Sequence, residues 1–300
     1  MRLAIFGNPV SSSHSELERS LFELMNCLGD EILVEQEYYR YLTGQLKWEI
    51  SCNGIIRDDN FLADAVISIG GDGTFLRAAS RVGNKGIPML GINAGRLGFL
   101  ADTTEQRAGD AIRMLHLGRY TIGQRALLQI SMDSLKEGIS PFALNDIALL
   151  KHDVSSMISI TAKIDGTPLT TYMADGLVIA TPTGSTAYSL SVGGPVIAPG
   201  TDVIELTPVA PHSLTMRPLI IQGSRVITLT VESRSHNFLV SIDGRSFSCK
   251  DGTQIEIRRA PHKISIIKPE GTDFFDTLRE KMMWGTDTRG LTSVHQSEAT

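Results

Sequence analysis

The first third of the chain alternates short apolar runs with stretches that repeat apolar residues every three or four positions. The apolar runs have the length of strands and lie at residues 3–6, 65–69 and 87–92. Helical spacing occurs over residues 15–28, from about 74 to 82, over 104–117, and more weakly over 38–48. Strands that alternate with helices form a parallel sheet with helices on both faces. We therefore predict an α/β domain with a Rossmann-like parallel sheet over residues 1–124.

The pattern changes near Tyr120, and from residue 125 onward short β-like runs replace the helical spacing. The expected strands are residues 126–132, 142–149, 157–164, 176–180, 219–222, 226–231, 238–242, 254–258 and 263–267. Turn dipeptides such as Asp165-Gly166 and Asp243-Gly244 separate several of these runs. We predict a mostly antiparallel, β-sandwich-like domain over residues 125–271.

The end of the chain departs from the β pattern. Helical spacing returns over residues 272–284, and we expect this C-terminal helix to pack back on the first domain. Residues 285–300 form a polar tail with little to bury, and this composition predicts disorder.

Composition narrows the class of protein. The 300-residue chain is 42% hydrophobic and 20% charged, as is typical of a globular chain with room for two domains. Its net charge of −5 argues against nucleic acid as a partner, since nucleic-acid-binding proteins usually carry a basic face. No run approaches the roughly 18 apolar residues of a membrane span, so we expect no membrane partner. Three widely spaced cysteines without a CxxC pair favour a reducing, cytoplasmic compartment.

A glycine-rich turn, Gly70-Gly71-Asp72-Gly73-Thr74, follows the apolar run at residues 65–69. Glycines let the backbone approach a bulky ligand, and the N-terminus of the following helix attracts phosphate oxygens. The carboxylate of Asp72 would repel a phosphate unless a metal ion or a proton transfer makes use of it. The alternative is an ordinary strand-to-helix turn in which Asp72 or Thr74 caps the helix. The turn matches neither a Walker A loop nor a GxGxxG fingerprint.

A hydroxyl-rich loop follows the apolar run at residues 176–180, where Pro182 prevents the strand from continuing. Its hydroxyl side chains surround one glycine and belong to Thr183, Ser185, Thr186, Tyr188, Ser189 and Ser191. Hydroxyls and backbone N–H groups bind sugar hydroxyls, phosphates and base edges without adding charge. The alternative is a Ser/Thr-rich surface turn. The tyrosine and the closing Gly193-Gly194-Pro195 are unusual in such turns, so we favour a binding loop.

The residues alone do not decide the role of two further places in the chain, the Asn145-Asp146 pair and Arg77. Asn145 and Asp146 interrupt a β-like run, and burying an amide beside a carboxylate without partners is costly. They either bind a ligand or form a turn or bulge, which both residue types favour. Arg77 lies one helical turn beyond the glycine-rich turn, where it either meets a phosphate or is a solvated helix arginine.

Together these segments resemble the NAD kinase family over about residues 1–283. The matching motifs occur in the family's order: Gly70–Thr74, Gly91-Ile-Asn-Ala-Gly-Arg-Leu-Gly-Phe-Leu100, Asn145-Asp146, Asp175-Gly176 and Thr181–Tyr188. The glycine-rich motif is shared with phosphofructokinases and diacylglycerol kinases, so it marks only a superfamily. The segment Thr181-Pro-Thr-Gly-Ser-Thr-Ala-Tyr188 narrows the resemblance to NAD kinases.

The resemblance implies transfer of the γ-phosphoryl group of ATP to the 2′-hydroxyl of the adenosine ribose of NAD, giving NADP. It implies that Asp72 accepts the proton of that hydroxyl. The expected dinucleotide-binding residues are Asp72, Gly73, Asn145, Asp146, Asp175, Thr186, Ala187, Tyr188, Ser189, Leu190 and Ser191, to which we add Arg77. A divalent ion, Mg²⁺, is expected with ATP, although the sequence shows no dedicated metal cage. The family also suggests a homodimer or homotetramer.

The chain departs from the family pattern at a few positions. Many relatives have Asn-Glu where this chain has Asn145-Asp146, basic residues in place of Met173 and Ala174, and a glutamine in place of Arg245. Lys151 and His152, just beyond the Asn-Asp pair, have no assigned role. Two other functions stay open: a sugar-phosphate or lipid kinase of the same superfamily, and a dinucleotide sensor without turnover. The hydroxyl-rich loop argues against the first, and the intact Asp72 argues against the second.

Overall fold

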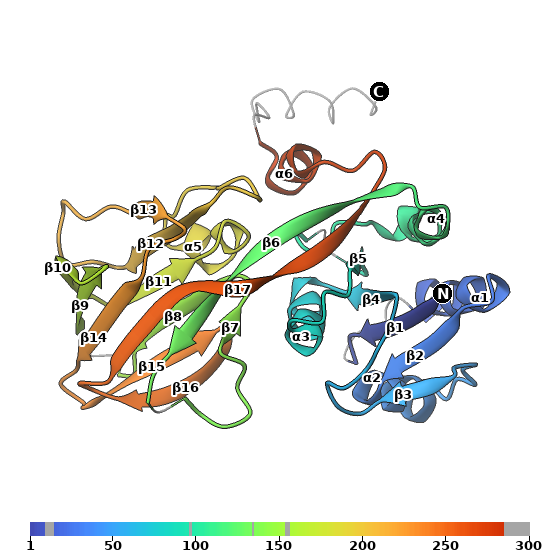
Figure 1. Ribbon diagram of the computed structural model, residues 1–300, viewed down its shortest axis with the longest axis horizontal. Coiled ribbons are helices and arrows are strands. Elements are labelled where there is room, and N and C mark those ends of the chain that lie inside the picture. The colour runs from blue at the N-terminus through green and yellow to red at the C-terminus, as the bar shows by residue number, and fades with distance from the viewer. Residues whose placement is uncertain (10–14, 96–97, 134, 154–156, 285–300) are drawn as a thin grey trace, which may run out of the picture.

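The computed structural model describes residues 1–9, 15–95, 98–133, 135–153 and 157–284. The polar tail predicted over residues 285–300 lies outside the described residues, as do Arg96 and Leu97 of the 91–100 motif. Two lobes are joined by a long pair of strands, β6 (Tyr120–Ser131) and β17 (Gln254–Pro269) (Figure 1).

The N-terminal lobe is an α/β structure with the parallel strand order β5-β4-β1-β2-β3. The strands are β1 (Arg2–Gly7), β2 (Glu31–Glu35), β3 (Gly54–Ile56), β4 (Ala65–Gly70) and β5 (Met89–Asn93). The helices are α1 (Ser15–Cys27), α2 (Gln36–Arg40), α3 (Asp72–Val82) and α4 (Glu105–His116). Every residue of β4 and β5 is buried, because parallel strands are covered on both faces. The helix predicted over 38–48 is instead α2 followed by a π-helical turn, η2 (Tyr41–Gln45).

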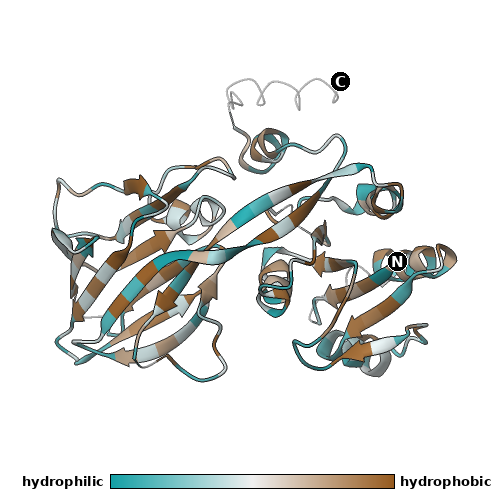
Figure 2. Ribbon diagram, viewed as in Figure 1, coloured by the Kyte–Doolittle hydropathy of each residue, from teal (hydrophilic) through white to brown (hydrophobic). Residues whose placement is uncertain are grey.

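The C-terminal lobe consists of two antiparallel layers. One is a six-stranded sheet with the order β13-β12-β11-β8-β15-β16, and the other contains β10-β9-β14-β17 with β6 and β7. The bounds are β7 (Phe142–Ala143), β8 (Asp146–Lys151), β9 (Ile158–Ile164), β10 (Thr167–Ala174), β11 (Gly176–Ala180), β12 (Val203–Val209), β13 (Leu219–Gln222), β14 (Ile227–Glu232), β15 (Asn237–Ile242) and β16 (Arg245–Lys250). Their inward apolar side chains form one core, visible as brown segments along the strands (Figure 2). The predicted fold class is confirmed.

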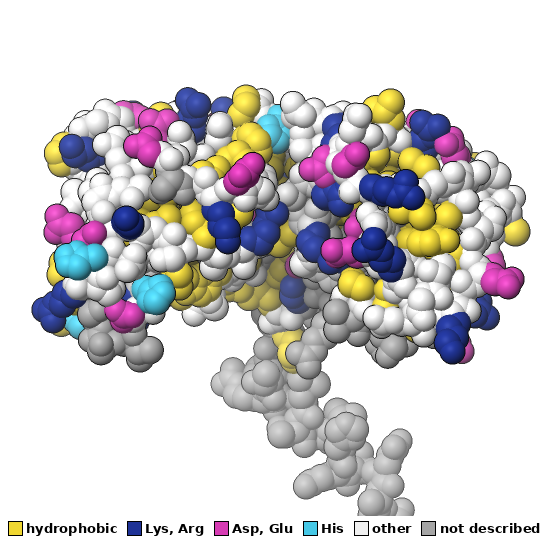
Figure 3. Space-filling model, turned by 90° about the horizontal axis from the view of Figure 1, so that it is seen from below, with side chains coloured by type: hydrophobic (Ala, Val, Ile, Leu, Met, Phe, Trp, Pro, Cys, Tyr) yellow, Lys and Arg dark blue, Asp and Glu magenta, His cyan; other side chains and the backbone are white. Residues whose placement is uncertain are grey.

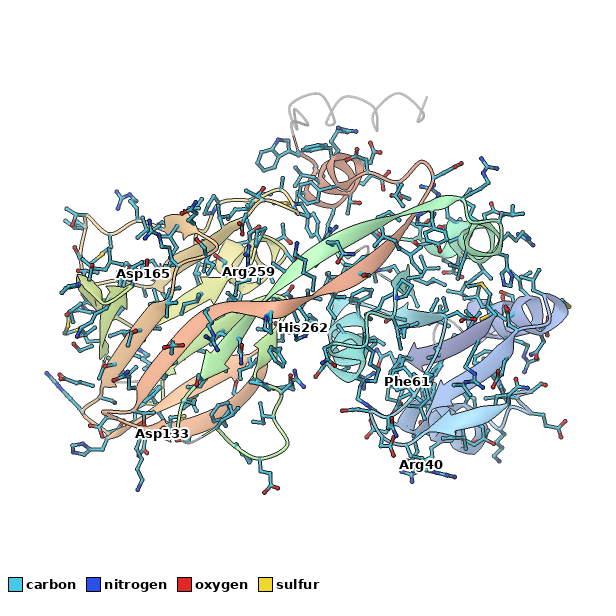
Figure 4. All side chains as sticks on the ribbon, viewed as in Figure 1. Arg40, Phe61, Asp133, Asp165, Arg259 and His262 are labelled. Atoms are coloured by element: carbon cyan, nitrogen blue, oxygen red, sulfur yellow. The ribbon has the colours of Figure 1, made fainter. Side chains whose placement is uncertain are left out.

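Strand β17 continues through both lobes. It pairs with β6 along most of its length and reaches the parallel sheet at Ile266, opposite Met89 of β5. The runs predicted at 254–258 and 263–267 are therefore one strand, with a register shift between Arg259 and Lys263. His262 lies within this irregular stretch, beside the N-terminal lobe (Figure 4), and its ring packs edge-on against Phe142. The strand pair thus makes the two lobes parts of one sheet.

Three short helices complete the described chain. Helices η3 (Gly184–Thr186) and α5 (Tyr188–Ser191) carry the hydroxyl-rich loop. Helix α6 (Phe274–Met282) begins at Asp273, whose side chain accepts a hydrogen bond from the N–H of Phe275, and it lies beside the β6–β17 pair (Figure 1). In the parts of the chain described above, no helix is long and apolar enough to cross a membrane.

Candidate active site

Asp72 lies in the first turn of α3, directly after the buried strand β4. Gly71 is the N-cap residue and no side chain caps this helix, so the capping role is not realised. The Asp72 carboxylate instead accepts hydrogen bonds from three backbone N–H groups, those of Phe99 on Oδ2 and of Leu100 and Ala101 on Oδ1, each 3.0 Å long. A carboxylate has about four acceptor positions. The contacts within the described chain leave one of them on Oδ2, and the side chain is 31% exposed.

Two glycines of the 91–100 motif make this arrangement possible. A Cβ on Gly98 would overlap the Asp72 carboxylate, and a Cβ on Gly91 would overlap the backbone of Leu100 and Ala101. The loop can therefore wrap closely around the carboxylate only with glycine at these positions. The motif, which the sequence identified only by its resemblance, is the structural support of Asp72.

Arg77 lies one turn further along α3 and is bonded to the main chain. Its Nη2 donates to the carbonyl oxygen of Gly7, at the end of β1, over 2.8 Å. It lines a cavity of about 250 Å³ whose other lining residues are Phe6, Glu35, Glu37, Ser80, Arg81 and Arg245. Arg245 comes from the other lobe and donates to Ser80 Oγ over 3.2 Å. Basic side chains also gather along the middle of the face seen in Figure 3, where the lobes meet.

Asn145 and Asp146 lie at a corner between β7 and β8, and the carboxylate of Asp243 holds this corner in place. The N–H groups of Leu144, Asn145 and Asp146 donate to Asp243, over 2.8, 2.8 and 3.2 Å. Asp243 has a φ of 47° and joins β15 to β16 in a tight turn with Gly244. The sequence identified Asp243-Gly244 only as a turn and missed this contact. In the sequence, the Asp-Gly dipeptide predicts a turn, but it does not show which N–H groups the aspartate carboxylate accepts from.

The hydroxyl-rich loop packs directly against this corner. The N–H of Thr181 donates to the carbonyl oxygen of Asn145 over 2.9 Å, and Thr181 Oγ1 donates to that of Leu144 over 2.6 Å. A Cβ on Gly184 would overlap the backbone of Asn145, so this position requires glycine. The structure therefore brings together the Asn145-Asp146 pair and the loop that follows β11.

The loop hydroxyls divide into exposed and buried groups. Tyr188 is exposed, and its pKa is raised by burial and, to a smaller extent, by the charges of Asp146 and Asp175. Thr186, Ala187 and Leu190 are also partly exposed. The Ser191 hydroxyl is exposed and donates to the carbonyl oxygen of Tyr188 over 2.8 Å.

Ser189 differs from the expectation that its hydroxyl faces a ligand. The side chain is fully buried, and its Oγ donates to Glu205 Oε1 over 2.7 Å and lies 3.0 Å from Thr207 Oγ1. Ser185 is equally buried and donates to the carbonyl oxygen of Pro182. These two hydroxyls face the interior and fix the loop. Glu205, a buried carboxyl on β12 whose pKa burial raises, is a second residue that the sequence missed.

Asp175 forms an ion pair with Lys151 over 2.8 Å, and this contact gives the lysine a role that the sequence left open. Both residues lie at one end of the β8–β11 pair, where Gly176 faces Leu150, whereas Asp146 lies at the other end, opposite Ala180. His152 is exposed and pairs with its neighbour Asp153 over 3.1 Å. Lys151 thus pairs with the predicted residue Asp175, at a distance from the Asn145-Asp146 corner, whereas His152 is exposed.

Both lobes match models of one protein family. Residues 3–120 match the ATP-NAD kinase N-terminal domain, and residues 144–269 match the ATP-NAD kinase C-terminal domain. The chain belongs to the NAD kinase family. The resemblance inferred from the glycine-rich turn and the 181–188 segment is thereby confirmed.

Individual members of the family match over nearly the whole chain. A NAD kinase of Bacteroides fragilis is 55% identical over 289 residues, covering 96% of this chain and 100% of that protein. The yeast NADH kinase complexed with NADH superimposes with a TM-score of 0.86 at 24% identity, covering 96% of this chain and 88% of that one. The NAD kinase of Archaeoglobus fulgidus in complex with ATP has a TM-score of 0.73 at 25% identity, with coverages of 94% and 99%.

The aspartate that replaces the family's more common glutamate gives a prediction of pH dependence. Asp146 is 6% exposed, and burial, followed by the charge of Asp243, raises its pKa to about 7 from the usual 3.8. Between these two values the unfolded chain releases this proton while the folded chain keeps it. Stability from this group therefore falls as pH rises, by up to about 1.4 kcal/mol per pH unit.

We expect wild type to lose more stability than Asp146→Asn between pH 5 and pH 7, measured by urea unfolding. The charged or titratable groups that face Asp146 are Asp243 and Tyr188, and both are retained in the variant, so the difference between the two proteins reports Asp146 itself. An identical pH dependence in the two proteins would contradict a raised pKa.

Proposed function

We propose that this member of the NAD kinase family transfers the γ-phosphoryl group of ATP to the 2′-hydroxyl of the adenosine ribose of NAD, with Asp72 as the proton acceptor. The observation that carries the proposal is the Asp72 carboxylate. It is fixed by three backbone N–H groups, stands in a glycine-rich turn at the end of a buried strand, and keeps an acceptor position on Oδ2. Ligands of parallel sheets bind at this end of the strands.

The acceptor dinucleotide would bind on the side of the second lobe. Asn145 and Asp146 lie at one end of the β8–β11 pair, next to the loop that contains residues 186–191, and Asp175 lies at the other end of the pair. Together these residues offer an amide, carboxyl groups, hydroxyls and backbone N–H groups. Such groups recognise ribose and amide functions by hydrogen bonding. The loop packs on the Asn145-Asp146 corner through Thr181 and Gly184, which supports one continuous binding surface. We assign Gly73 and Arg77, on helix α3, to the dinucleotide-binding residues of the same site.

The reaction does not require a strong base. Phosphoryl transfer is loose and largely dissociative in most analyses, so the nucleophilic hydroxyl needs little activation before the phosphorus–oxygen bond of ATP breaks. Asp72 orients the ribose hydroxyl through its remaining acceptor position on Oδ2 and takes its proton as the new bond forms. The three N–H donors hold the carboxylate in one orientation, which lowers the entropy lost when the substrate binds.

Mg²⁺ is the divalent ion that we propose to accompany ATP, where it neutralises triphosphate charge. Within the described ranges, no group of three or more His, Cys, Asp or Glu side chains is arranged to hold a metal ion. Mg²⁺ does not require such a group, since it usually keeps several waters and binds through substrate phosphates and one or two carboxylates.

The proposal extends to assembly and location. By family membership we propose a homodimer or homotetramer, which light scattering of the purified protein would test, and a monomer at assay concentration would contradict it. We also propose a reducing cytoplasmic location, in which Cys27, Cys52 and Cys249 would remain outside disulfides.

The deciding experiment is an assay of the purified protein with ATP and NAD, with and without Mg²⁺, in which NADP is measured by a coupled NADP-specific dehydrogenase. We expect NADP and ADP in equal amounts, with turnover dependent on the metal. Parallel reactions replace NAD by a sugar phosphate or by diacylglycerol. ADP formed only with one of those acceptors would favour the other kinases, and NAD binding without product would favour a sensor.

A further inference from the structure

Helix α6, at the end of the described chain, docks on the loop that holds Asp72. The Phe274 ring lies 6.0 Å from the Phe99 ring between centroids, and Lys281 Nζ lies 4.4 Å from the centre of that same ring. Phe99 donates its backbone N–H to Asp72 Oδ2. The first and last turns of α6 therefore both contact the residue whose backbone orients the Asp72 carboxylate.

The last turn of α6 brings a cation to the Asp72 carboxylate. Lys281 Nζ lies 3.9 Å from Asp72 Oδ2, the oxygen that retains an acceptor position. The Lys281 side chain is 33% exposed, and ion pairs exposed to this extent stabilise a fold by only about 0–1 kcal/mol. Arg279, two residues earlier, instead pairs with Asp276 inside the helix. Lys281 is thus the basic residue of α6 that reaches the site.

Phosphoryl transfer concentrates negative charge at this position. The γ-phosphoryl oxygens must approach a ribose hydroxyl that is itself bonded to Asp72, so three anionic oxygens come close to a carboxylate. Fixed positive groups at developing charge provide a large part of catalysis in such reactions. An ammonium group on a flexible four-carbon stem suits this purpose because it presents three donors and reaches a range of positions.

We propose that Lys281 is a further catalytic residue, whose ammonium group contacts the transferring γ-phosphoryl group and neutralises its charge beside Asp72. The proposal rests on the kinase function proposed above. The bond from the γ-phosphorus to the ADP oxygen breaks, the bond to the ribose 2′-oxygen forms, and the hydroxyl proton passes to Asp72. Lys281 stays protonated throughout and is not consumed. Phe99 supports the lysine, since its ring faces the cation and holds it over the carboxylate.

The test compares Lys281→Met with Arg279→Met, a matched control on the same helix whose side chain makes its ion pair away from Asp72. Removing one fixed donor at developing charge typically lowers turnover on the order of 100-fold. We expect a loss of that order in kcat for Lys281→Met, with KM for NAD close to wild type and the melting temperature unchanged. We expect wild-type kcat for Arg279→Met and partial recovery for Lys281→Arg.

A second comparison separates contact with the phosphoryl group from an effect through Asp72. Lys281→Met is also made in the Asp72→Asn variant and followed in single turnovers. A lysine that contacts the phosphoryl group still lowers the rate in that background, whereas one that only pairs with the Asp72 charge has no further effect.

Each outcome is decisive. If wild type forms NADP and Lys281→Met has normal kcat, or if its effect vanishes beside Asp72→Asn, the role of Lys281 is overturned and the kinase function stands. If wild type itself forms no NADP, both proposals fall.

Discussion

Replacing Asp72 by asparagine is expected to lower kcat by about 10²- to 10⁴-fold, the usual contribution of general-base assistance. NAD should still bind measurably, because the Asn145-Asp146 corner and the hydroxyl-rich loop are held by contacts that do not involve Asp72. An amide cannot accept the ribose proton. Steady-state formation of NADP and calorimetric titration with NAD measure the two effects separately.

The asparagine also changes the loop, so this experiment needs a control. Its amide nitrogen would face the N–H of Phe99 in place of Oδ2, which removes one of the three hydrogen bonds. Asp58→Asn is a matched variant in the same lobe: Asp58 also accepts a backbone N–H, that of Asn60, at an exposed position. We expect normal turnover from Asp58→Asn. Turnover close to wild type in Asp72→Asn would eliminate the base assignment.

The fold class could be predicted because, in most helices and strands, the residues that are apolar in the sequence are also the residues that are buried in the structure. Strand β4 is apolar throughout and buried throughout, so its sequence alone shows its place in a covered sheet. Strand β12 was missed because Glu205, Thr207 and Pro208 interrupt its apolar residues, and the buried partners of Glu205 cannot be identified from the sequence. Strand β17 was divided in two because its register shifts between Arg259 and Lys263, a stretch that contains Pro261, and this irregularity breaks the alternation without ending the strand.

The candidate site was predictable only where glycine and hydroxyl spacing carried a local signal. Asp72 and the loop at residues 181–191 follow from such spacing. The positions of Asp243 and Lys281 do not, because their partners are distant in the sequence: Asp243 bonds to backbone groups 97 to 99 residues away. For Ser189, its position in the hydroxyl-rich loop does not reveal that its hydroxyl is buried and donates to Glu205.

Asp243→Asn is expected to raise KM for NAD on the order of tenfold and to lower the free energy of unfolding by about 1–3 kcal/mol, the cost of one unsatisfied buried donor. The asparagine oxygen can still accept from Asn145 and Asp146, whereas its amide nitrogen would face the N–H of Leu144. Because these donors form the corner that presents the Asn145-Asp146 pair, loss of the carboxylate should displace that pair. We expect kcat at saturating NAD to change much less than KM.

Asp165→Asn provides the matched control for this prediction. Asp165 occupies the same kind of Asp-Gly turn in the same lobe, with a φ of 48°, and its carboxylate accepts the N–H of Val226 over 2.9 Å and pairs with Arg225. Its surroundings are exposed, so its replacement should change stability by less than about 0.5 kcal/mol and leave KM unaltered. If Asp243→Asn loses stability but keeps a normal KM for NAD, Asp243 only stabilises the fold. A raised KM in Asp243→Asn and not in Asp165→Asn would instead establish that a carboxylate outside every matching motif positions the acceptor-binding corner.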